Sequence, residues 1–387
     1  MGGGGPYAAE RGWVKRWYLS ACLIILLVAT GLRFYRLDTQ SFWNDEGNTA
    51  RLVERPVVLI LEGAAGDIHP PGYYLLLHVW RTFTGDSEFA LRAFSALCGV
   101  LTVAVAAAAG RYAGGRRVAL GAALIVTLHP LSIYYSQEAR MYALLGLTSA
   151  LTLWAGIRIT HYALHIPHYV PRFTHRVLLL AFCIALGLYT QYAFIFVLVG
   201  LNLAFGVDWL LRRPWDWRTL WRWIAAHALA GLAFLPWAPI ALRASDWRPP
   251  DLTSVQAIQE ITRALLVGIT LPVRAVPWMT VCAALLLLLA FTTRARSRFA
   301  VWTAAGMALV PALLLVAFGL YRPAYLKFLM ASVAPMAVVL ALPLRRAGSR
   351  FGIVRNCMAG LLLVLLFGAQ VISLRHLYTD PAYARDD

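Results

Sequence analysis

The chain has 387 residues, of which 60% are hydrophobic and only 14% are charged, and its mean hydropathy is +0.65. Because a soluble domain is about half apolar and about a quarter charged, this composition excludes a soluble globular protein and indicates an integral membrane protein. The formal net charge is +17, but the arginines are spread over short loops between apolar runs. The positive-inside rule places arginines in this way, which argues against nucleic-acid binding.

The first apolar run, residues 17–36, follows a basic segment and is followed by no small-residue cleavage site. We therefore interpret it as an uncleaved first membrane span rather than as a signal peptide. The later runs have about the length that crosses a bilayer and lack the alternation of a β-barrel. The sequence predicts an all-α polytopic membrane protein with about 11 transmembrane helices, near residues 17–36, 90–110, 118–135, 141–158, 176–191, 192–211, 220–241, 275–293, 299–320, 325–343 and 356–374.

Residues 70–83 decide the orientation of the chain. This apolar run is only about 14 residues long, and runs of that length more often lie at the membrane interface than cross it. If it does not cross and the N-terminus is cytoplasmic, 20 of the 35 Lys and Arg residues lie inside, with only three of the 18 acids, Glu10, Asp208 and Asp216. A twelfth span would move most Arg-rich loops outside, against the positive-inside rule.

With this topology, residues 37–88 form a long first extracytoplasmic loop. We expect interfacial helices in it, one over Asp45–Leu61 with an interruption at Pro56 and one over Pro70–Phe83. Residues 243–274 form a second large loop on the same side. Long ordered loops in compact proteins are often functional.

Residues 243–274 contain a segment with helical amphipathic spacing, Ser254–Ile269, after a start that suits an N-cap. We find no internal repeat and no soluble domain, so residues 1–387 are expected to form a single membrane domain without a soluble C-terminal domain. The five cysteines lie inside apolar runs, and we expect neither a disulfide nor a metal site from them. The inside histidines His161, His165 and His168 lack nearby acids or cysteines, so no metal site is predicted there.

Asp45 and Glu46 form an adjacent acidic pair in the first extracytoplasmic loop. A carboxylate at a membrane surface, partly shielded by aromatic side chains, can act as a general base on a hydroxyl. The alternative is that these acids only offset the dipole in the first turn of a helix. The residue pattern alone leaves both interpretations open.

His69 precedes two prolines in the string DIHPPGYY, which also contains Tyr73. Proline starts a helix well, and a histidine at such a start could donate to an anion with help from the helix dipole. A His-Pro-Pro sequence is also often only a turn. The motif by itself does not decide between these two interpretations.

Glu138 and Arg140 lie at the outer junction between two predicted spans, where they could grip a phosphate or orient a sugar hydroxyl. Tyr189 and Gln191 belong to another polar aromatic cluster on the same face. Ionisable residues at span ends also snorkel to the interface without any other role. The density of polar and aromatic groups here favours a functional site.

Arg322, Tyr325 and Lys327 lie at the outer start of a predicted span. Lys327 is one of only two lysines in the chain. A cation inside the start of a span needs a partner, and a lipid phosphate is a natural one, although snorkelling to headgroups is the alternative.

Four strings in this order, RFYRLDTQSFWNDE, DIHPPGYYLLLHVW, SEFALRAFSALCGV and YYSQEARMYALLGL, resemble the GT-C superfamily of polyprenyl-phosphate-sugar-dependent glycosyltransferases. The similar branch contains the protein O-mannosyltransferases and the aminoarabinose transferase of lipid A. The resemblance covers about residues 36–160 and extends to about residue 345. It departs from the family in the late loop, where the usual Arg-Tyr-Leu is spread out as Arg322-Pro-Ala-Tyr325-Leu326, which leaves the role of Arg322 in doubt.

The resemblance implies a GT-C fold and an inverting transfer of a sugar from a polyprenyl-monophosphate donor to an acceptor hydroxyl at the extracytoplasmic face of the bacterial cytoplasmic membrane. It implies that Asp45 deprotonates the acceptor and that Glu46 supports it or binds the donor sugar. His69, Arg140, Arg322 and Lys327 would be cations that contact the donor phosphate.

The alternative from another class is a lipid or lipid-linked-sugar flippase or transporter without covalent chemistry. Transporters place ionisable residues near the bilayer midplane and often show repeats, whereas here the charges gather at one surface. A non-catalytic scaffold is a third interpretation, against which the retained acids and Arg140 argue. The sequence names neither the sugar nor the acceptor, and it leaves open a divalent metal held by Asp45, Glu46 and Glu138.

Overall fold

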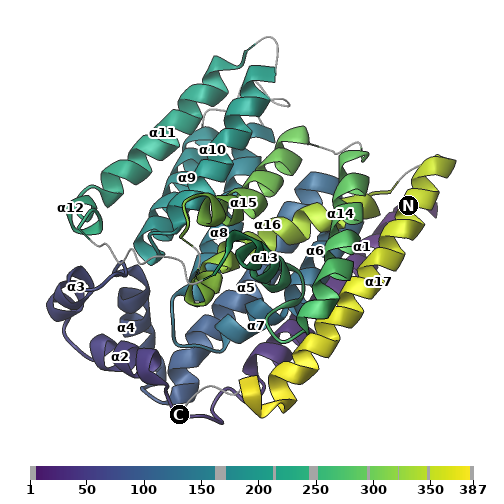
Figure 1. The fold of residues 1–387 in the computed structure, drawn as a ribbon. Helices are drawn as coiled ribbons and strands as arrows, with labels where there is room; N and C mark the ends of the chain where they lie inside the picture. The colour runs from purple at the N-terminus through teal and green to yellow at the C-terminus, as the bar shows by residue number, and fades with distance from the viewer. Residues whose placement is uncertain are drawn as a thin grey trace, which may run out of the picture.

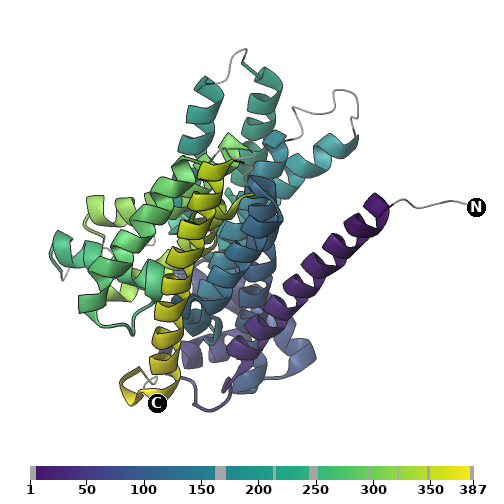
Figure 2. The ribbon, with the colours of Figure 1, turned by 90° about the vertical axis from the view of Figure 1, so that its right-hand side faces the viewer.

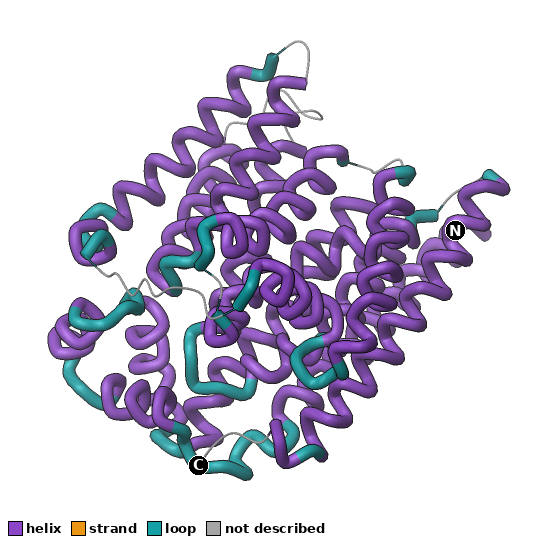
Figure 3. The backbone as a smooth tube through the Cα atoms, viewed as in Figure 1, coloured by secondary structure: helices purple, strands orange, loops and turns teal. Residues whose placement is uncertain are grey.

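The computed structural model describes residues 6–161, 171–211, 215–243, 252–293, 297–320, 322–346 and 349–383. Every regular element in these ranges is a helix, and none is a strand (Figure 3). This confirms the predicted all-α membrane architecture. His165 and His168, Tyr321 and much of the loop after residue 243 lie outside the described residues, as does the side chain of His161.

Eight helices in the described part of the chain are long and apolar enough to cross a membrane, and the bent pair α6 and α7 makes nine if it is counted as one span. The 3-10 turns η2 (Pro323–Leu329) and η3 (Leu342–Leu344) extend α16 on either side. The eight are α1 (Pro6–Phe34), α5 (Glu88–Gly114), α8 (Tyr142–His161), α10 (Phe194–Leu211), α14 (Val276–Phe291), α15 (Arg298–Ala317), α16 (Met330–Ala341) and α17 (Arg350–Thr379).

The two remaining predicted spans are also helices, α9 (Pro171–Thr190) and α11 (Trp217–Phe234). The apolar part of α9 is shorter than the eight candidates, and α11 is not apolar enough to count among them. The number of 11 spans therefore stays a prediction. Three short elements complete the chain, namely α12 (Ala238–Ala241), η1 (Val273–Ala275) and η4 (Pro381–Tyr383).

The first long loop folds into three short helices, α2 (Asn44–Val53), α3 (Val57–Ala65) and α4 (Gly72–Thr84). Pro56 separates α2 from α3 as the sequence predicts, because proline cannot donate the hydrogen bond that a continuous helix needs. The 13 residues of α4 reach only about 20 Å, too short for a bilayer core. These helices lie together at one end of the molecule, which we call the α2–α4 face (bottom of Figure 1).

The centre of the bundle is formed by α8 and α16. In each of these spans 83% of the most apolar window is buried inside the protein, compared with 22% for α1 and 39% for α17. Around them α10 and α15 cross with Gly200 against Gly306, where a side chain on either glycine would overlap the backbone of the other. Small residues allow such close packing of membrane helices.

The predicted span 118–135 is not one straight helix. It divides into α6 (Arg116–Leu128) and α7 (Pro130–Ser136), which are bent by 60° at His129 and Pro130. Arg33 at the end of α1 is completely buried and donates to the carbonyl of Val126 at 3.0 Å. Proline interrupts the helical hydrogen bonds, and the arginine satisfies a carbonyl that the break releases.

The second loop contains the predicted amphipathic helix as α13 (Ser254–Val267). Thr253 and Gln256 form a reciprocal capping box at its start, as the sequence indicates. Figure 2 shows that α1 and α17 both run down to the α2–α4 face, where the Tyr378 hydroxyl donates to the carbonyl of Leu32 at 2.5 Å.

Candidate active site

Asp45 and Glu46 lie in the first turn of α2, where carboxylates interact favourably with the helix dipole. Glu46 is completely buried. Its carboxylate accepts two hydrogen bonds from Arg92, from Nε at 3.0 Å and from Nη2 at 2.6 Å. It also accepts one from the backbone amide of Ala139 at 2.7 Å. Glu46 therefore holds the start of α2 against α5 and against the segment that leads into α8.

Arg92 of α5 uses its other N–H groups on the loop that precedes α2. Its Nη1 donates to the carbonyls of Leu37 at 3.0 Å and Gln40 at 2.7 Å, and its Nη2 donates to that of Ser41 at 2.9 Å. The sequence analysis missed this residue. The available signal was a lone arginine inside the apolar run 90–110, because a cation within a predicted span needs a nearby partner.

Asp45 has different surroundings from Glu46, since its side chain is 35% exposed. Its Oδ2 lies 3.5 Å from Nη2 of Arg140. Nη1 of Arg140 is 3.3 Å from the backbone carbonyl of Asp45 and 3.1 Å from Oγ1 of Thr49. Arg140 thus fixes the first turn of α2, while the Asp45 carboxylate keeps a surface that a substrate can reach.

Asp67 and His69 form a pair just before α4. Nδ1 of His69 lies 2.9 Å from Oδ2 of Asp67, and the amide of Ile68 donates to Oδ1 at 2.7 Å. Burial opposes the charge on Asp67, but these hydrogen bonds and the interaction with His69 outweigh it and hold the pKa of Asp67 below its usual value. Since an ionised carboxylate only accepts, Nδ1 of the neutral imidazole carries the proton and Nε2 is an acceptor.

The pKa of His69 is lowered, chiefly by burial of its side chain. The hydrogen bond with Asp67 works in the opposite direction, and the positive charges of Arg140 and Lys327 lower the pKa further. His69 is therefore neutral near pH 7 in the protein alone. A histidinium at this position would require an anion close by, so the role of His69 as a cation that contacts the donor phosphate stays a prediction.

Arg140 and Lys327 share the ring of Tyr142. Nζ of Lys327 is 5.0 Å from the ring centroid, and Cζ of Arg140 is 5.9 Å from it, both within the range of cation–π contacts. The structure thus gathers four predicted site residues from four separate segments. We call this group the carboxylate–cation cluster, and it consists of Asp45, His69, Arg140 and Lys327.

The position of the cluster depends on a close approach between α4 and α9. A Cβ atom at Gly72 would lie 2.6 Å from the carbonyl oxygen of Tyr189, so only glycine fits at the start of α4. This contact sets the Asp67–His69 pair beside the end of α9. The sequence motif that contains His69 therefore has a packing role as well as polar groups.

A family model described as dolichyl-phosphate-mannose-protein mannosyltransferase matches residues 68–242, a little under half of the chain. No curated protein matches the sequence. Among solved structures, ArnT from Cupriavidus metallidurans in the apo state superposes with a TM-score of 0.61 at 17% identity, over 90% of this chain and 62% of that one. The same enzyme bound to undecaprenyl phosphate gives a TM-score of 0.57 at 17% identity, over 94% of this chain and 73% of that one.

The archaeal oligosaccharyltransferase AglB from Archaeoglobus fulgidus, in complex with an inhibitory peptide and a dolichol-phosphate, gives a TM-score of 0.63 at 14% identity. The match covers 94% of this chain and 56% of that one. The chain therefore has the fold of these solved structures. It spans less than two thirds of the length of AglB and of apo ArnT, so it matches part of each of those proteins.

Tyr73 does not present its side chain to the carboxylate–cation cluster. It is completely buried, and its hydroxyl lies 3.0 Å from Oγ of Ser95, which in turn donates to the backbone carbonyl of Arg140 at 3.2 Å. The charge of Arg140 acts on the hydroxyls of both Tyr73 and the neighbouring Tyr74. Tyr73 therefore supports the backbone beneath Arg140, and substrate binding by its hydroxyl is not what the geometry favours.

Three other predicted residues, Tyr189, Gln191 and Glu138, are also engaged within the protein. The Tyr189 hydroxyl donates to the carbonyl of Ala233 at 3.0 Å, and Oε1 of Gln191 accepts from the amide of Tyr192 at 2.8 Å. Glu138 is buried. The contact of Tyr189 joins the end of α9 to α11, and that of Gln191 lies in the turn between α9 and α10. The roles of all three residues towards a substrate stay predictions.

Arg322 and Tyr325 lie at the start of η2, the turn that carries Lys327. The ring of Tyr325 stacks on that of Phe328, with centroids 5.3 Å apart. Only Lys327 of this motif has a described contact with the cluster. The functional assignment of Arg322 and Tyr325 stays a prediction.

The side-chain arrangement does not support a divalent metal held by Asp45, Glu46 and Glu138. Among the residues that the structure describes, no group of three or more His, Cys, Asp or Glu side chains could hold a metal ion. Glu46 in particular gives both carboxylate oxygens to Arg92.

Proposed function

We propose that this protein is a member of the GT-C superfamily, an inverting glycosyltransferase that moves a sugar from a polyprenyl-monophosphate carrier to an acceptor hydroxyl. The observation that carries the proposal is the carboxylate–cation cluster, in which the partly exposed carboxylate of Asp45 lies beside Arg140, and Arg140 shares the ring of Tyr142 with Lys327. The ArnT structure bound to undecaprenyl phosphate and the AglB structure bound to dolichol-phosphate support a lipid phosphate as the leaving group.

In the proposed reaction, Asp45 accepts the proton of the acceptor hydroxyl. The hydroxyl oxygen attacks the anomeric carbon of the sugar from the side opposite the phosphate. The new glycosidic bond forms as the bond between the anomeric carbon and the phosphate oxygen breaks, and the electron pair leaves with the polyprenyl phosphate. General-base catalysis of this kind typically contributes about 100- to 10,000-fold to the rate.

Arg140 and Lys327 are proposed to bind the phosphate and to stabilise the negative charge that develops on it. Preorganised cations aimed at developing charge are among the largest contributions to catalysis. Because Arg140 also lies 3.5 Å from Asp45, it can fix the position of the phosphate relative to the Asp45 carboxylate. A bound phosphate would raise the pKa of His69 and convert it to a donor.

Glu46 and Arg92 are proposed to position the base. Their buried pair fixes the first turn of α2, and Asp45 lies on the same turn. The charge distribution of the sequence supports a location in the bacterial cytoplasmic membrane with the α2–α4 face outside. Neither the sugar nor the acceptor follows from the cluster, and the membrane lipids complete the surroundings of the donor.

The test is transfer by the purified full chain in detergent, with a panel of radiolabelled polyprenyl-phosphate sugars as donors. We expect wild type to release label from one of these lipids, and Asp45→Asn to reduce the rate by about 100- to 10,000-fold. Lipid-phosphate binding should be retained in Asp45→Asn, because the cations remain.

The matched control is Asp38→Asn, which removes an exposed carboxylate from the same loop and should leave turnover unchanged. Wild-type activity in Asp45→Asn would contradict the assignment of the base. Tight lipid-phosphate binding without turnover of any donor would instead favour the flippase interpretation.

A further inference from the structure

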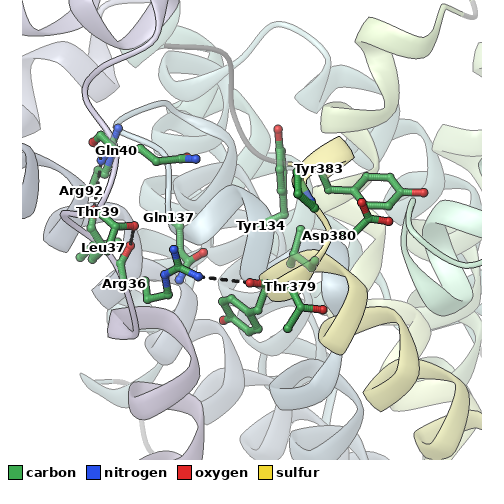
Figure 4. Close-up of a pocket in the computed structure, with 13 residues that line it drawn as sticks. Arg36, Leu37, Thr39, Gln40, Arg92, Tyr134, Gln137, Thr379, Asp380 and Tyr383 are labelled. Atoms are coloured by element: carbon green, nitrogen blue, oxygen red, sulfur yellow. Dashed lines mark hydrogen bonds between the residues drawn. The ribbon is translucent and has the colours of Figure 1, made fainter.

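A polar cavity of about 300 Å³ lies on the α2–α4 face, between the loop after α1 and the end of α17. Figure 4 shows its two walls and the side chains between them. The residues that matter below are Arg36 and Gln40 on one wall, Asp380 and Tyr383 on the other, and Tyr134 and Gln137 between them.

Arg36 is the one non-glycine residue among the described residues with a positive φ, at 58°. Such a conformation is unfavourable for a residue with a side chain, and strain of this kind often occurs at functional sites. The turn is held by the Thr39 hydroxyl, which donates to the carbonyl of Arg36 at 3.0 Å. It directs the guanidinium across the cavity, where Nη1 donates to the carbonyl of Tyr378 at 3.2 Å.

The cavity is close to the carboxylate–cation cluster. The ring of Tyr134, which lines the cavity, contacts that of Tyr135 with centroids 5.1 Å apart. Tyr135 contacts Tyr142 at 5.2 Å, and Tyr142 is the ring beneath Lys327. Two ring contacts therefore connect the cavity with the cations.

The lining also contains a part of the buried ion pair, since Arg92 contributes to the wall. All five N–H groups of Arg92 are already donated to Glu46 and to three backbone carbonyls. Arg92 thus offers no donor to a ligand. The guanidinium of Arg36 and the carboxylate of Asp380 then balance each other, which disfavours a simple anion site.

The remaining lining groups are amides, hydroxyls and phenol rings, together with the apolar side chains of Leu37, Leu377 and Pro381. The hydroxyls of Thr39, Tyr378 and Thr379 already donate within the protein, as does the amide of Gln137. Sugar hydroxyls donate and accept hydrogen bonds, and the apolar faces of sugar rings stack on aromatic side chains, so this mixture matches a carbohydrate. The volume is at the lower end of the range of small-molecule pockets, about 300–1,000 Å³. It suits the terminal ring of a saccharide better than a long oligosaccharide.

We propose that this cavity binds a sugar residue of the acceptor, so that the acceptor of the proposed transfer is a glycan. The assignment of the bound sugar to an acceptor rests on the proposed function. Saccharide binding itself can be measured without any donor. A peptide or a lipid hydroxyl as acceptor would leave the cavity without this role.

The first experiment is saturation-transfer NMR on the full chain in detergent, with the methyl glycosides of glucose, galactose, mannose and arabinose as probes. We expect at least one glycoside to bind wild type. Tyr383→Ala and Gln40→Ala should each weaken that binding at least fivefold, and the control Asp38→Ala should not. Melting temperatures of all variants check that each one is folded.

Binding of no glycoside, or equal binding by wild type, Tyr383→Ala and Gln40→Ala, would overturn the proposal. Displacement of the glycoside by inorganic phosphate would also overturn it, because it would mark an anion site. If wild type binds a glycoside but turns over no donor lipid, the proposed function fails while the saccharide site stands. If turnover occurs with peptide acceptors and no glycoside binds, the reverse holds.

Discussion

Two ion pairs begin at neighbouring residues of α2 and have opposite surroundings. Glu46 and Arg92 are both buried and meet at 2.6 Å with two hydrogen bonds. Asp45 and Arg140 meet at 3.5 Å, and the Asp45 side chain is 35% exposed. The acidic pair of the sequence is therefore one structural carboxylate and one that a substrate can reach.

The difference shows that burial, rather than residue type, determines which of the two adjacent carboxylates has a structural role and which can contact a substrate. Removing one partner of a buried ion pair leaves an uncompensated charge and costs about 3–5 kcal/mol. In the second pair only Arg140 is buried, and the partly exposed Asp45 carboxylate can be replaced by water, so breaking this pair should cost less than breaking the first. Substitutions at the two positions should thus separate activity from stability.

The largest expected effect is on catalysis at Asp45. Asp45→Asn should lower turnover by about 100- to 10,000-fold, while the melting temperature changes little because the pair with Arg140 is partly exposed. Turnover and thermal unfolding measured on the same preparation check this. A large loss of stability in Asp45→Asn would show that Asp45, like Glu46, has a structural role.

The next effect is on stability at the buried pair. Arg92→Ala should destabilise the protein by about 3–5 kcal/mol because it leaves the Glu46 carboxylate without its counter-ion. Thermal unfolding monitored by size-exclusion chromatography measures the loss. The double variant Glu46→Gln with Arg92→Met should recover part of it, since both charges are gone, and no recovery would contradict the ion-pair explanation.

Lys327 should affect donor affinity more than stability. Lys327→Gln removes a charge-assisted contact to phosphate, worth about 1.5–3 kcal/mol, and should weaken polyprenyl-phosphate binding about tenfold or more. Lys327→Arg keeps the charge and is the matched control. Equal affinity of wild type and Lys327→Gln for the lipid phosphate would remove Lys327 from the cluster.

The smallest expected effect is a pH dependence at His69. Burial lowers its pKa, so the imidazole is neutral near pH 7, and binding of an anion must add a proton to it. Wild type should therefore bind lipid phosphate a few-fold more tightly, relative to His69→Gln, as the pH falls from about 8 to about 6. Parallel pH profiles of the two proteins would show that His69 takes up no proton.

The sequence predicts the fold well because hydropathy acts directly on membrane helices. The interruption at Pro56 and the helix start at Ser254 also follow from local chemistry. The break between α6 and α7 was missed, although His129 and Pro130 mark it, because a hydropathy average does not register a change of direction. Arg33, which satisfies the carbonyl released there, is remote in sequence.

The sequence indicates which residues form the carboxylate–cation cluster but not what each one contacts. Asp45, His69, Arg140 and Lys327 come together as their common face predicts. The burial of Glu46 and Tyr73 depends on tertiary contacts with α5 that no local pattern specifies. The cavity near Arg36 depends on α17, hundreds of residues away, and leaves no local signal.

Arg33 gives α1 a mechanical connection to the cluster. Its guanidinium donates to Val126 in α6 and to Ser132 in α7, on both sides of the break from which the segment with Arg140 continues. The rest of α1 is largely exposed on the surface of the protein, and the tilt of a membrane helix with such exposure follows bilayer thickness. Because Arg33 fixes one end of α1 near the cluster, a change in the tilt of α1 would move α6 and α7. We therefore expect bilayer thickness to influence the position of Arg140.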